Sequence, residues 1–213
     1  MNIGILGSGM VGQALGLGFV QRGDEVVVGT RDAGGDKLRD WVARTDGRGR
    51  AGTFAEAAAF GEVAVLATLW DGTENALRLA DPASLAGKVV IDVTNPLDFS
   101  TGMPRLSIGF SDSGGEQVQR WLPDSRVVKA FSIITAGEMV HPEFPCGPPT
   151  MFIAGDDDGA KGTVSGICRD FGWEVEDVGA MEAARLLEPL AVLWITHAVR
   201  TGAYGHAFKL LRK

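Results

Sequence analysis

The sequence predicts an α/β fold in which a doubly wound parallel sheet is followed by a small C-terminal lobe ending in an apolar helix. Three observations support this prediction. Short apolar runs of strand length recur along the 213 residues, and segments of helical composition lie between most of them. Runs such as Val63-Ala64-Val65-Leu66 and Val89-Val90-Ile91 are nearly continuously apolar rather than alternating, which is typical of parallel strands covered by helices on both faces.

Seven apolar runs are predicted as strands, and several of the intervening segments as helices. The predicted strands are Asn2–Gly7, Glu25–Gly29, Val63–Thr68, Lys88–Val93, Arg126–Phe131, Thr150–Ala154 and Trp173–Val178. The predicted helices are Met10–Arg22, Asp36–Thr45, Thr53–Phe60 and Gly72–Ala80.

Three further segments carry expectations of their own. Asn95–Ser113 and Ala136–Pro149 are long and rich in proline and glycine, so we expect functional or mobile loops there. The last element, from Met181 to about Leu211, is predicted as a helix. Within it, Pro189 is expected to cause a kink or to begin a new first turn.

The composition excludes several classes of function. The chain has 20 Lys and Arg against 27 Asp and Glu, a net charge of −7, so no broad basic surface is available for nucleic acid or anionic lipid. No apolar run approaches the ~20 residues that span a bilayer, and the N-terminus lacks the basic leader of a signal peptide. Cys146 and Cys168 lack metal-ligand spacing and are expected to be unpaired thiols, a single disulfide being the alternative. We therefore expect a cytoplasmic protein without nucleic acid or membrane partners.

The segment GSGMVG, which begins at Gly7, has the G-x-G-x-x-G spacing of a dinucleotide-binding turn. It follows an apolar run and opens a helical stretch, which is the context that this motif requires. Gly7 is expected to permit the tight turn, Gly9 to let the backbone approach a pyrophosphate, and Gly12 to let helix and strand pack closely. The free N–H groups of Met10 and Val11 would then hold the phosphate charge. The alternative is a glycine-rich turn that serves fold geometry alone.

The second apolar run ends in GTRD, at the place where NAD-selective domains have an acidic residue that binds the ribose 2′-hydroxyl. This chain has Gly29 there, followed by Thr30 and Arg31. A hydroxyl and a guanidinium would bind a 2′-phosphate, which a carboxylate would repel. The sequence therefore predicts NADP(H) as the cofactor. The alternative is a surface arginine paired with Asp32 or Asp36.

GSGMVG, VVVGTRD, AVLATLW and DVTNP, in this order, resemble the NADP-binding lobe of the deazaflavin-dependent NADP oxidoreductase family. Those enzymes move hydride between NADP(H) and 8-hydroxy-5-deazaflavin, coenzyme F420. The resemblance continues through VVKAF, IAGDD and ARLLEPL, so it covers nearly the whole chain. The cytosolic domains of six-transmembrane metalloreductases look similar too, although no membrane part is expected here.

Two domains are expected, and the resemblance adds Thr68–Trp70 and Asn95-Pro96 to the site residues that the two motifs supply. An NADP-binding Rossmann domain is expected over residues 1–131, and a small substrate-binding and dimerisation lobe over residues 132–213. Thr68–Trp70 would flank the nicotinamide ribose, although Trp70 could equally be a packing residue. Asn95-Pro96 would lie at the end of the next strand, or form a simple turn. The residues expected to bind NADP(H) are Gly7, Ser8, Gly9, Met10, Val11, Gly12, Thr30, Arg31, Thr68, Leu69, Trp70, Asn95 and Pro96.

By the same resemblance, the segment FSIITAG covers the hydride-transfer site and meets the second substrate. Archaeal family members have a histidine where this chain has Ser132, so the identity of the acceptor stays open. Ile133, Ile134 and Met139 offer an apolar shelf for a flat ring, which favours a deazaflavin or flavin; ordinary packing is the alternative. His141 could donate to the substrate or be solvated, and Lys129 could be a buried acid catalyst.

Hydride transfer needs positioning more than acid–base help, so neither a catalytic triad nor a metal site is expected. Two other functions remain open: an NADP(H)-dependent dehydrogenase or imine reductase of a small organic substrate, and a catalytically silent NADP(H)-sensing module. A homodimer through the C-terminal helix is expected, because its apolar residues cannot all lie on one side of a single helix. These residues are Leu186, Leu187, Leu190, Leu193 and Trp194.

Overall fold

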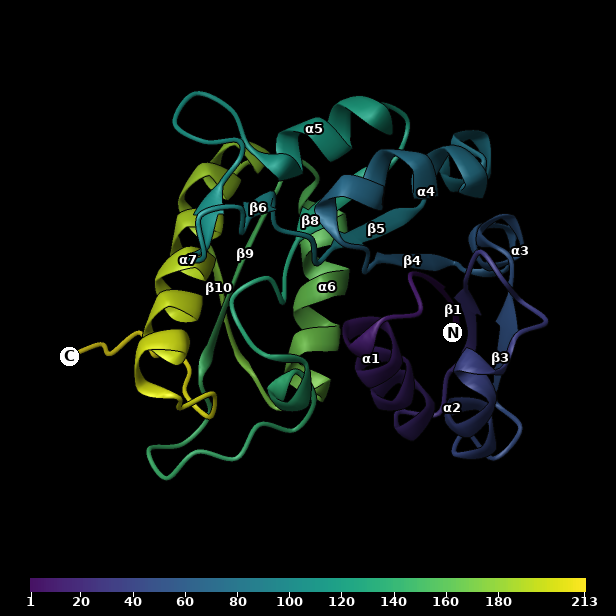
Figure 1. Cartoon of the computed structure of the whole chain (residues 1–213), viewed down its shortest axis with the longest axis horizontal. Coiled ribbons are helices and arrows are strands. Elements are labelled where there is room, and N and C mark those ends of the chain that lie inside the picture. Colours follow the sequence, from purple (N-terminus) through teal and green to yellow (C-terminus); the bar gives the residue numbers. More distant parts are fainter.

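The computed structural model describes residues 1–213 and is built on an eight-stranded sheet with helices on both faces (Figure 1). The strand order is β10-β9-β8-β5-β4-β1-β2-β3. Six neighbouring strands run parallel to one another: β8, β5, β4, β1, β2 and β3. Strand β9 pairs with β8 in the antiparallel direction, and β10 runs parallel to β9. The predicted fold class is therefore confirmed.

The elements have the following bounds. The strands of the large sheet are β1 (Asn2–Leu6), β2 (Glu25–Gly29), β3 (Gly49–Gly52), β4 (Val63–Leu66), β5 (Val89–Asp92), β8 (Arg126–Lys129), β9 (Thr150–Gly155) and β10 (Glu174–Asp177). The helices are α1 (Met10–Gln21), α2 (Arg39–Ala43), α3 (Phe54–Phe60), α4 (Thr73–Ala80), α5 (Gly114–Trp121), α6 (Asp158–Asp170) and α7 (Ala184–Thr201). All seven predicted strands and all four predicted internal helices are present, with ends that differ by a few residues.

Side chains of successive strand residues point to opposite faces of the sheet, and each face has its own core. Ile3 and Ile5 of β1 lie in a core that α1, α2, α6 and α7 complete. Leu6 lies in a second core, completed by α3, α4 and α5. Gly4 also faces α3, where an added Cβ would come within 2.0 Å of the Ala57 carbonyl oxygen. Both faces of the sheet are therefore covered, as the continuous apolar runs predict.

Five strands and helices were not among the predicted ones. β3 reads Gly-Arg-Ala-Gly and carries no strand pattern; its pairing with β2 makes it a strand. The first predicted loop contains a small hairpin of β6 (Leu97–Asp98) and β7 (Arg105–Leu106). Helices α5 and α6 begin at the caps Ser113 and Asp157, whose side chains accept from backbone N–H groups three residues on.

The predicted C-terminal helix is wrong beyond residue 201. A short 3-10 turn over Met181–Ala183 leads into α7, which ends where Gly202 adopts the left-handed conformation (φ 72°). The chain then reverses, and the carbonyl of Phe208 accepts from the N–H of Thr150 (2.9 Å). Pro189 lies inside α7 rather than at a new first turn.

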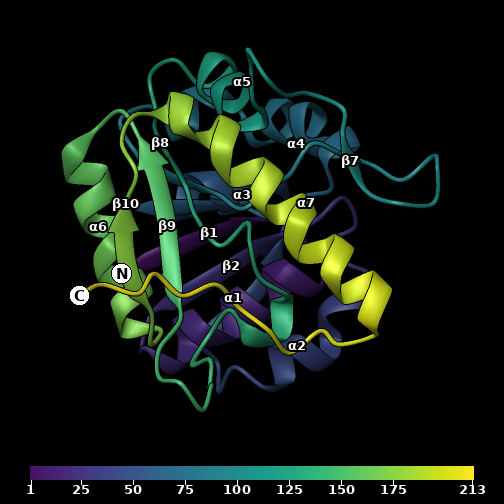
Figure 2. The same cartoon turned by 90° about the vertical axis from the view of Figure 1, so that its left-hand side faces the viewer.

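Helix α7 crosses in front of the sheet in the view of Figure 2, and the C-terminal tail runs back below it. β9 and β10 extend the same sheet that begins with β1, so the first core spans both predicted domains. The division at residues 131 and 132 stays a prediction. No helix has the length and apolar character needed to span a membrane.

Candidate functional site

The candidate site lies where the order of the parallel strands reverses, at the carboxyl ends of β1 and β4. Adjacent parallel strands leave a crevice at such a point, because their connections pass to opposite faces of the sheet. Backbone hydrogen bonds hold the strand ends together: Gly7 N–H donates to Gly29 O (3.2 Å), and Ala67 N–H donates to Leu6 O (2.9 Å). Val93 N–H donates to the carbonyl at the end of β4 in the same way (3.1 Å). The turns after β1, β2, β4 and β5 therefore meet at one edge.

The three glycines of the first turn differ in what surrounds them. Gly7 has φ 134°, and a Cβ there would lie 2.3 Å from the Ala67 carbonyl oxygen. A Cβ on Gly12 would lie 1.9 Å from the Gly7 carbonyl oxygen. Gly9 has open space, with no atom within 4 Å of where its Cβ would be. The fold itself therefore requires Gly7 and Gly12, whereas Gly9 leaves a space that a ligand can fill.

The N-terminus of α1 opens into this space. Gly9 is the N-cap residue and supplies no capping side chain, and the first turn has no acidic residue. The first N–H groups of a helix, here those of Met10 and Val11, have no partner within the helix. Met10 is 82% exposed, so this end of the helix is accessible. A helix N-terminus without a capping side chain, beside open space, fits the pyrophosphate of a dinucleotide.

Thr30 and Arg31 follow the end of β2, beside the glycine turn. The hydroxyl of Ser8 donates to the hydroxyl of Thr30 (3.2 Å), and both residues are buried. Arg31 is exposed and makes no ion pair. Asp36, one of the two partners that the alternative interpretation offered, pairs with Arg39 instead. A hydroxyl and an unpaired guanidinium thus lie together where a 2′-phosphate is expected.

The segment after β4 contributes both exposed and packed groups. Thr68 shares a hydrogen bond with the hydroxyl of Thr73 (2.8 Å), which ties it to the first turn of α4. Leu69 is 88% exposed at the edge. Trp70 stacks on Trp121 of α5, with ring centroids 5.5 Å apart and an interplanar angle of 27°. The packing role that the sequence left open for Trp70 is therefore present.

Asn95 joins the turns after β5 and β8. Its Nδ2 donates to the carbonyl of Ser132 (2.8 Å), and the backbone carbonyl of Asn95 accepts from Leu97 N–H (2.9 Å). The side-chain Oδ1 of Asn95 is buried and has no hydrogen-bond partner. Because a buried acceptor without a partner costs free energy, this oxygen fits a ligand that donates an N–H, such as a carboxamide.

Of the residues predicted to contact the second substrate, Ser132 lies beside the site and the isoleucines that follow it lie in the core. Ser132 lies beside Asn95 and is 8% exposed. The three residues of the predicted shelf, Ile133, Ile134 and Met139, are 3%, 8% and 2% exposed and belong to the first core. They therefore do not form an exposed shelf, because their side chains point into the protein and support the Ser132 turn from within.

His141 lies away from the glycine turn. Its N–H donates to the carbonyl of Phe171 (2.8 Å), and the preceding Val140 packs against Gly18 near the end of α1. Gly18 lies eight residues beyond Met10, about 12 Å along the helix. The structure thus brings the predicted cofactor residues together but does not bring His141 to them.

The sequence singled out Lys129 but missed its partners. Lys129 is wholly buried, and its Nζ lies 2.9 Å from both Asp92 Oδ2 and Glu188 Oε1. Burial alone would lower the pKa of Lys129, but the two carboxylates outweigh it and hold this pKa above its ordinary value. Asp92 and Glu188 are distant in sequence from Lys129 and from each other, so no local motif could have indicated the cluster.

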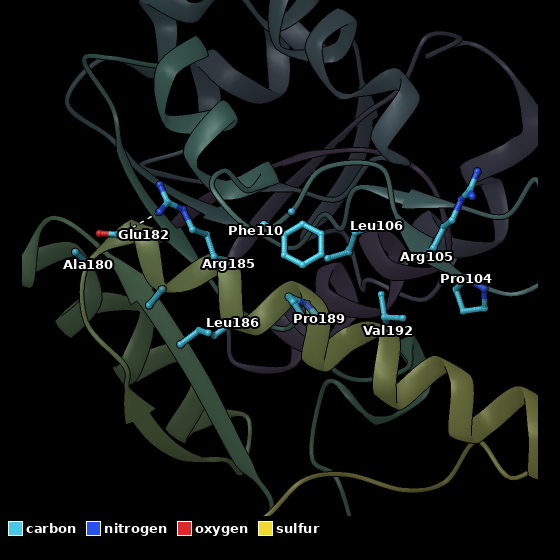
Figure 3. Close-up of a pocket in the computed structure, with 12 residues that line it drawn as sticks. Pro104, Arg105, Leu106, Phe110, Ala180, Glu182, Arg185, Leu186, Pro189 and Val192 are labelled. Carbon is cyan, nitrogen blue, oxygen red and sulfur yellow. Dashed lines mark hydrogen bonds and ion pairs between the residues drawn. The ribbon is translucent and has the colours of Figure 1, made fainter.

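A separate groove of about 1020 Å³ lies between α7 and the β6–β7 hairpin, which follows Asn95 and Pro96 directly (Figure 3). Its apolar lining includes Leu106, Phe110 and Leu186. Phe110 is fully exposed and Leu186 is 71% exposed, so the groove opens outward. None of the residues that line this groove belongs to the glycine turn, so the two are separate features of the surface.

Comparison with known proteins gives sequence relatives along nearly the whole chain. The family model for coenzyme F420-dependent NADP oxidoreductases matches residues 2–96. An F420-dependent NADP reductase from Methanothermobacter marburgensis is 32% identical over 206 residues, covering 92% of this chain and 91% of that protein. The metalloreductase STEAP3 from Rattus norvegicus is 34% identical over 202 residues, covering 90% of this chain and 37% of that protein.

Solved structures agree with this result. A crystal structure from Arthrobacter sp. FB24, provisionally described as an F420-dependent NADP reductase, has a TM-score of 0.93 and 35% identity, with full coverage of both chains. A reductive aminase from Aspergillus terreus, in complex with NADPH, has a TM-score of 0.69 at 18% identity and covers 94% of this chain and 63% of its own. At that identity the second likeness concerns the fold alone.

Proposed function

Because the chain belongs to the coenzyme F420-dependent NADP oxidoreductase family, we propose that it transfers hydride between NADP(H) and a deazaflavin of the coenzyme F420 type. The observation that carries this proposal is similarity above 30% over nearly the full length of a reductase with that activity. The glycine turn and the strand-end residues beside it are consistent with the NADP(H) half of the reaction.

We assign the cofactor along the carboxyl edge of the sheet. The N–H groups of Met10 and Val11 and the space above Gly9 would receive the pyrophosphate. Thr30 and Arg31 would bind the 2′-phosphate, since a guanidinium makes paired, charge-assisted bonds to phosphate oxygens. The nicotinamide would reach Thr68 and Asn95 on the other side of the strand reversal. The unpartnered Oδ1 of Asn95 supports this direction.

NADP(H) supplies or accepts the hydride at its nicotinamide ring. The protein contributes positioning, because reacting carbons must be held ~3–3.5 Å apart with water excluded. Asn95 serves this purpose: its Nδ2 is fixed on Ser132 O, so its Oδ1 has a defined direction. The buried Ile133 and Ile134 hold the Ser132 turn in place from below. No side chain is required to move a proton during the hydride step itself.

We also propose a homodimer formed through α7. Leu187 and Trp194 face the protein core, whereas Leu186 and Leu193 on the other side are 71% and 57% exposed. With Pro189 they form an apolar stripe at i, i+3 and i+7 spacing. Leu186 and Pro189 of this stripe line the groove of Figure 3. A second copy is the natural cover for such a stripe. The two free cysteines, Cys146 and Cys168, are consistent with the further proposal of a cytoplasmic location.

The test is rapid mixing of NADPH-loaded protein with F420, followed at the absorbance of the nicotinamide, with flavin mononucleotide as the comparison acceptor. We expect fast oxidation of NADPH by the deazaflavin and slow or no oxidation by the flavin. Oxidation by neither acceptor, with NADPH still bound, would contradict the assignment of the acceptor. If the protein did not bind NADPH at all, the whole proposal would be contradicted.

A further inference from the structure

A buried cluster of three charged residues lies directly beneath the nicotinamide end of the proposed site. Asp92 and Lys129 are the last residues of β5 and β8 and stand opposite each other in the sheet. Glu188 reaches them from α7, and all three side chains are at most 1% exposed. We refer to these residues as the Asp92–Lys129–Glu188 cluster.

Every polar atom of the cluster has a partner. The Nζ of Lys129 has three acceptors: Asp92 Oδ2 and Glu188 Oε1, each at 2.9 Å, and the backbone carbonyl of Thr94 at 2.6 Å. Asp92 Oδ1 accepts from both the N–H (2.9 Å) and the hydroxyl (2.7 Å) of Thr94. Thr94 is therefore held by three bonds from two members of the cluster.

Glu188 connects the cluster to a third element. Its carboxylate accepts from the N–H groups of Gly114 and Gly115 at the start of α5, both at 2.9 Å. The cluster has two carboxylates but only one ammonium group. The two N–H donors and the positive end of the α5 dipole compensate the remaining negative charge. A Cβ added to Gly114 would lie 3.1 Å from both Pro96 Cδ and Trp70 Cζ3, so the start of α5 lies close to the turns after β4 and β5.

The cluster holds Thr94, the residue directly before the proposed nicotinamide contact Asn95. Thr94 precedes Asn95, whose Nδ2 bonds to Ser132 O, three residues after Lys129. Two hydrogen bonds thus join the chain after β5 to the end of β8 and the turn that follows it. Lys129 Nζ donates to Thr94 O, and Asn95 Nδ2 donates to Ser132 O. The direction of the free Asn95 Oδ1 depends on both joins.

Stability alone does not account for this arrangement. Three buried charges cost desolvation free energy that their mutual attraction repays only in part, and apolar replacements of such clusters are often neutral or stabilising. A defined geometry, in contrast, needs several directional bonds to one short segment.

We propose that the Asp92–Lys129–Glu188 cluster positions the nicotinamide end of the site, by fixing Thr94 and Asn95 relative to Ser132 and by making that placement depend on α7. The inference rests on the proposed function for the identity of the ligand. It assigns a positioning role to Glu188, a residue of the C-terminal lobe that lies outside the nucleotide-binding motifs.

The test compares NADPH with 2′,5′-ADP, which carries the 2′-phosphate but has no nicotinamide. In Glu188→Gln, we expect the dissociation constant for NADPH to rise about tenfold, while that for 2′,5′-ADP stays within about twofold. Turnover with F420 should fall about a hundredfold, since small misplacements of reacting groups have effects of this size. Thr94→Val retains all ion pairs and removes one hydroxyl bond, so it should shift the same measurements in the same direction by less.

Glu116→Gln is the matched control. It weakens the bonds from Arg185 to Glu116 (2.6 and 2.9 Å), which also join α7 to α5 but lie away from Thr94. We expect it to lower the melting temperature without changing either dissociation constant.

Two results would overturn the inference: equal losses of NADPH and 2′,5′-ADP binding in both Glu188→Gln and Thr94→Val, or no change for NADPH in either. If Glu188→Gln does not fold, Thr94→Val decides alone. Absence of F420 turnover in the unmodified protein would contradict the proposed function, but the comparison of the two ligands would still decide the role of the cluster.

Discussion

At the scale of single residues, the glycine turn separates two physical requirements that a sequence motif combines. Gly7 and Gly12 have no room for a side chain. A Cβ added at either position would lie only 2.3 Å or 1.9 Å, respectively, from a backbone carbonyl oxygen. Gly9 is bordered by open space and has an extended backbone (φ −78°, ψ −177°) that any residue can adopt. Substitution at these positions should therefore affect different measurements.

Gly9→Ala should leave the free energy of unfolding within about 0.5 kcal/mol of the unmodified protein and weaken NADPH binding about tenfold or more. The reason is that its methyl group meets the ligand and not the protein. Gly12→Ala, the matched comparison, should lose about 1–3 kcal/mol of stability by overpacking. Denaturant unfolding and NADPH titration of both variants check this. A large loss of stability in Gly9→Ala would contradict the inference that the space beside Gly9 is open to the ligand.

Arg31→Ala should weaken NADPH binding about tenfold to a hundredfold and leave NADH binding unchanged, because only NADPH carries the phosphate that the guanidinium would contact. Fluorescence titration with both cofactors measures the difference. Arg39→Ala is the control, since it removes the same charge from a nearby residue paired with Asp36. Equal weakening of NADPH and NADH by Arg31→Ala would show that another residue selects the cofactor.

At the scale of elements, β5, β8, α5 and α7 are held together by buried charge as well as by apolar packing. The pKa of Lys129 lies above its ordinary value because the nearby carboxylates outweigh the effect of burial. A raised pKa in the folded state means that the ion pairs stabilise the fold throughout the neutral range. This contribution is lost only as the pH rises through the pKa of the folded state.

Lys129→Met should destabilise the protein by about 3–5 kcal/mol, because two carboxylates would remain buried without their cation. Lys209→Met, which breaks a partly exposed pair with Glu174, should cost at most about 1 kcal/mol. Urea unfolding at pH 7 measures both values. A cost for Lys129→Met as small as that for Lys209→Met would mean that Asp92 and Glu188 find other partners or become protonated.

At the scale of the whole molecule, α7 has two apolar sides, and the chain covers one of them. Its inner side packs on the sheet through Leu187, Ala191 and Trp194. The outer side presents Leu186 and Leu193, and Leu186 lines the same groove as the fully exposed Phe110. Neighbouring apolar side chains that remain exposed on a folded chain typically mark an interface.

A double variant, Leu186→Glu with Leu193→Glu, should convert the proposed homodimer to a monomer at micromolar concentration, because four carboxylates would be buried in a symmetric interface. Sedimentation velocity measures the mass. Leu79→Glu on α4 is the control, since it places a charge at another partly exposed leucine. A monomeric unmodified protein would remove the proposal for dimerisation through α7.

The local pattern of the sequence was enough to predict most of the strands and several of the helices between them, because apolar runs and helical composition are properties of neighbouring residues. It was enough as well for the glycine turn and for GTRD, since both motifs follow a strand directly. It could not predict β3, whose four residues form a strand only because β2 pairs with them. The end of the C-terminal helix was also missed, because the chain beyond Gly202 bonds to distant Thr150 and Trp194.

The sequence by itself determined the fold class and the positions of the glycine turn and of GTRD at the ends of two strands, all of which depend on residues close together in the chain. Only the tertiary structure decided that Ile133 and Ile134 are buried, that Trp70 stacks on Trp121, and that Glu188 meets Lys129. The physical reason is the range of the interactions involved. Propensity and periodicity act along the chain, whereas burial and the pairing of charges depend on elements that only the packed sheet and its helices bring together.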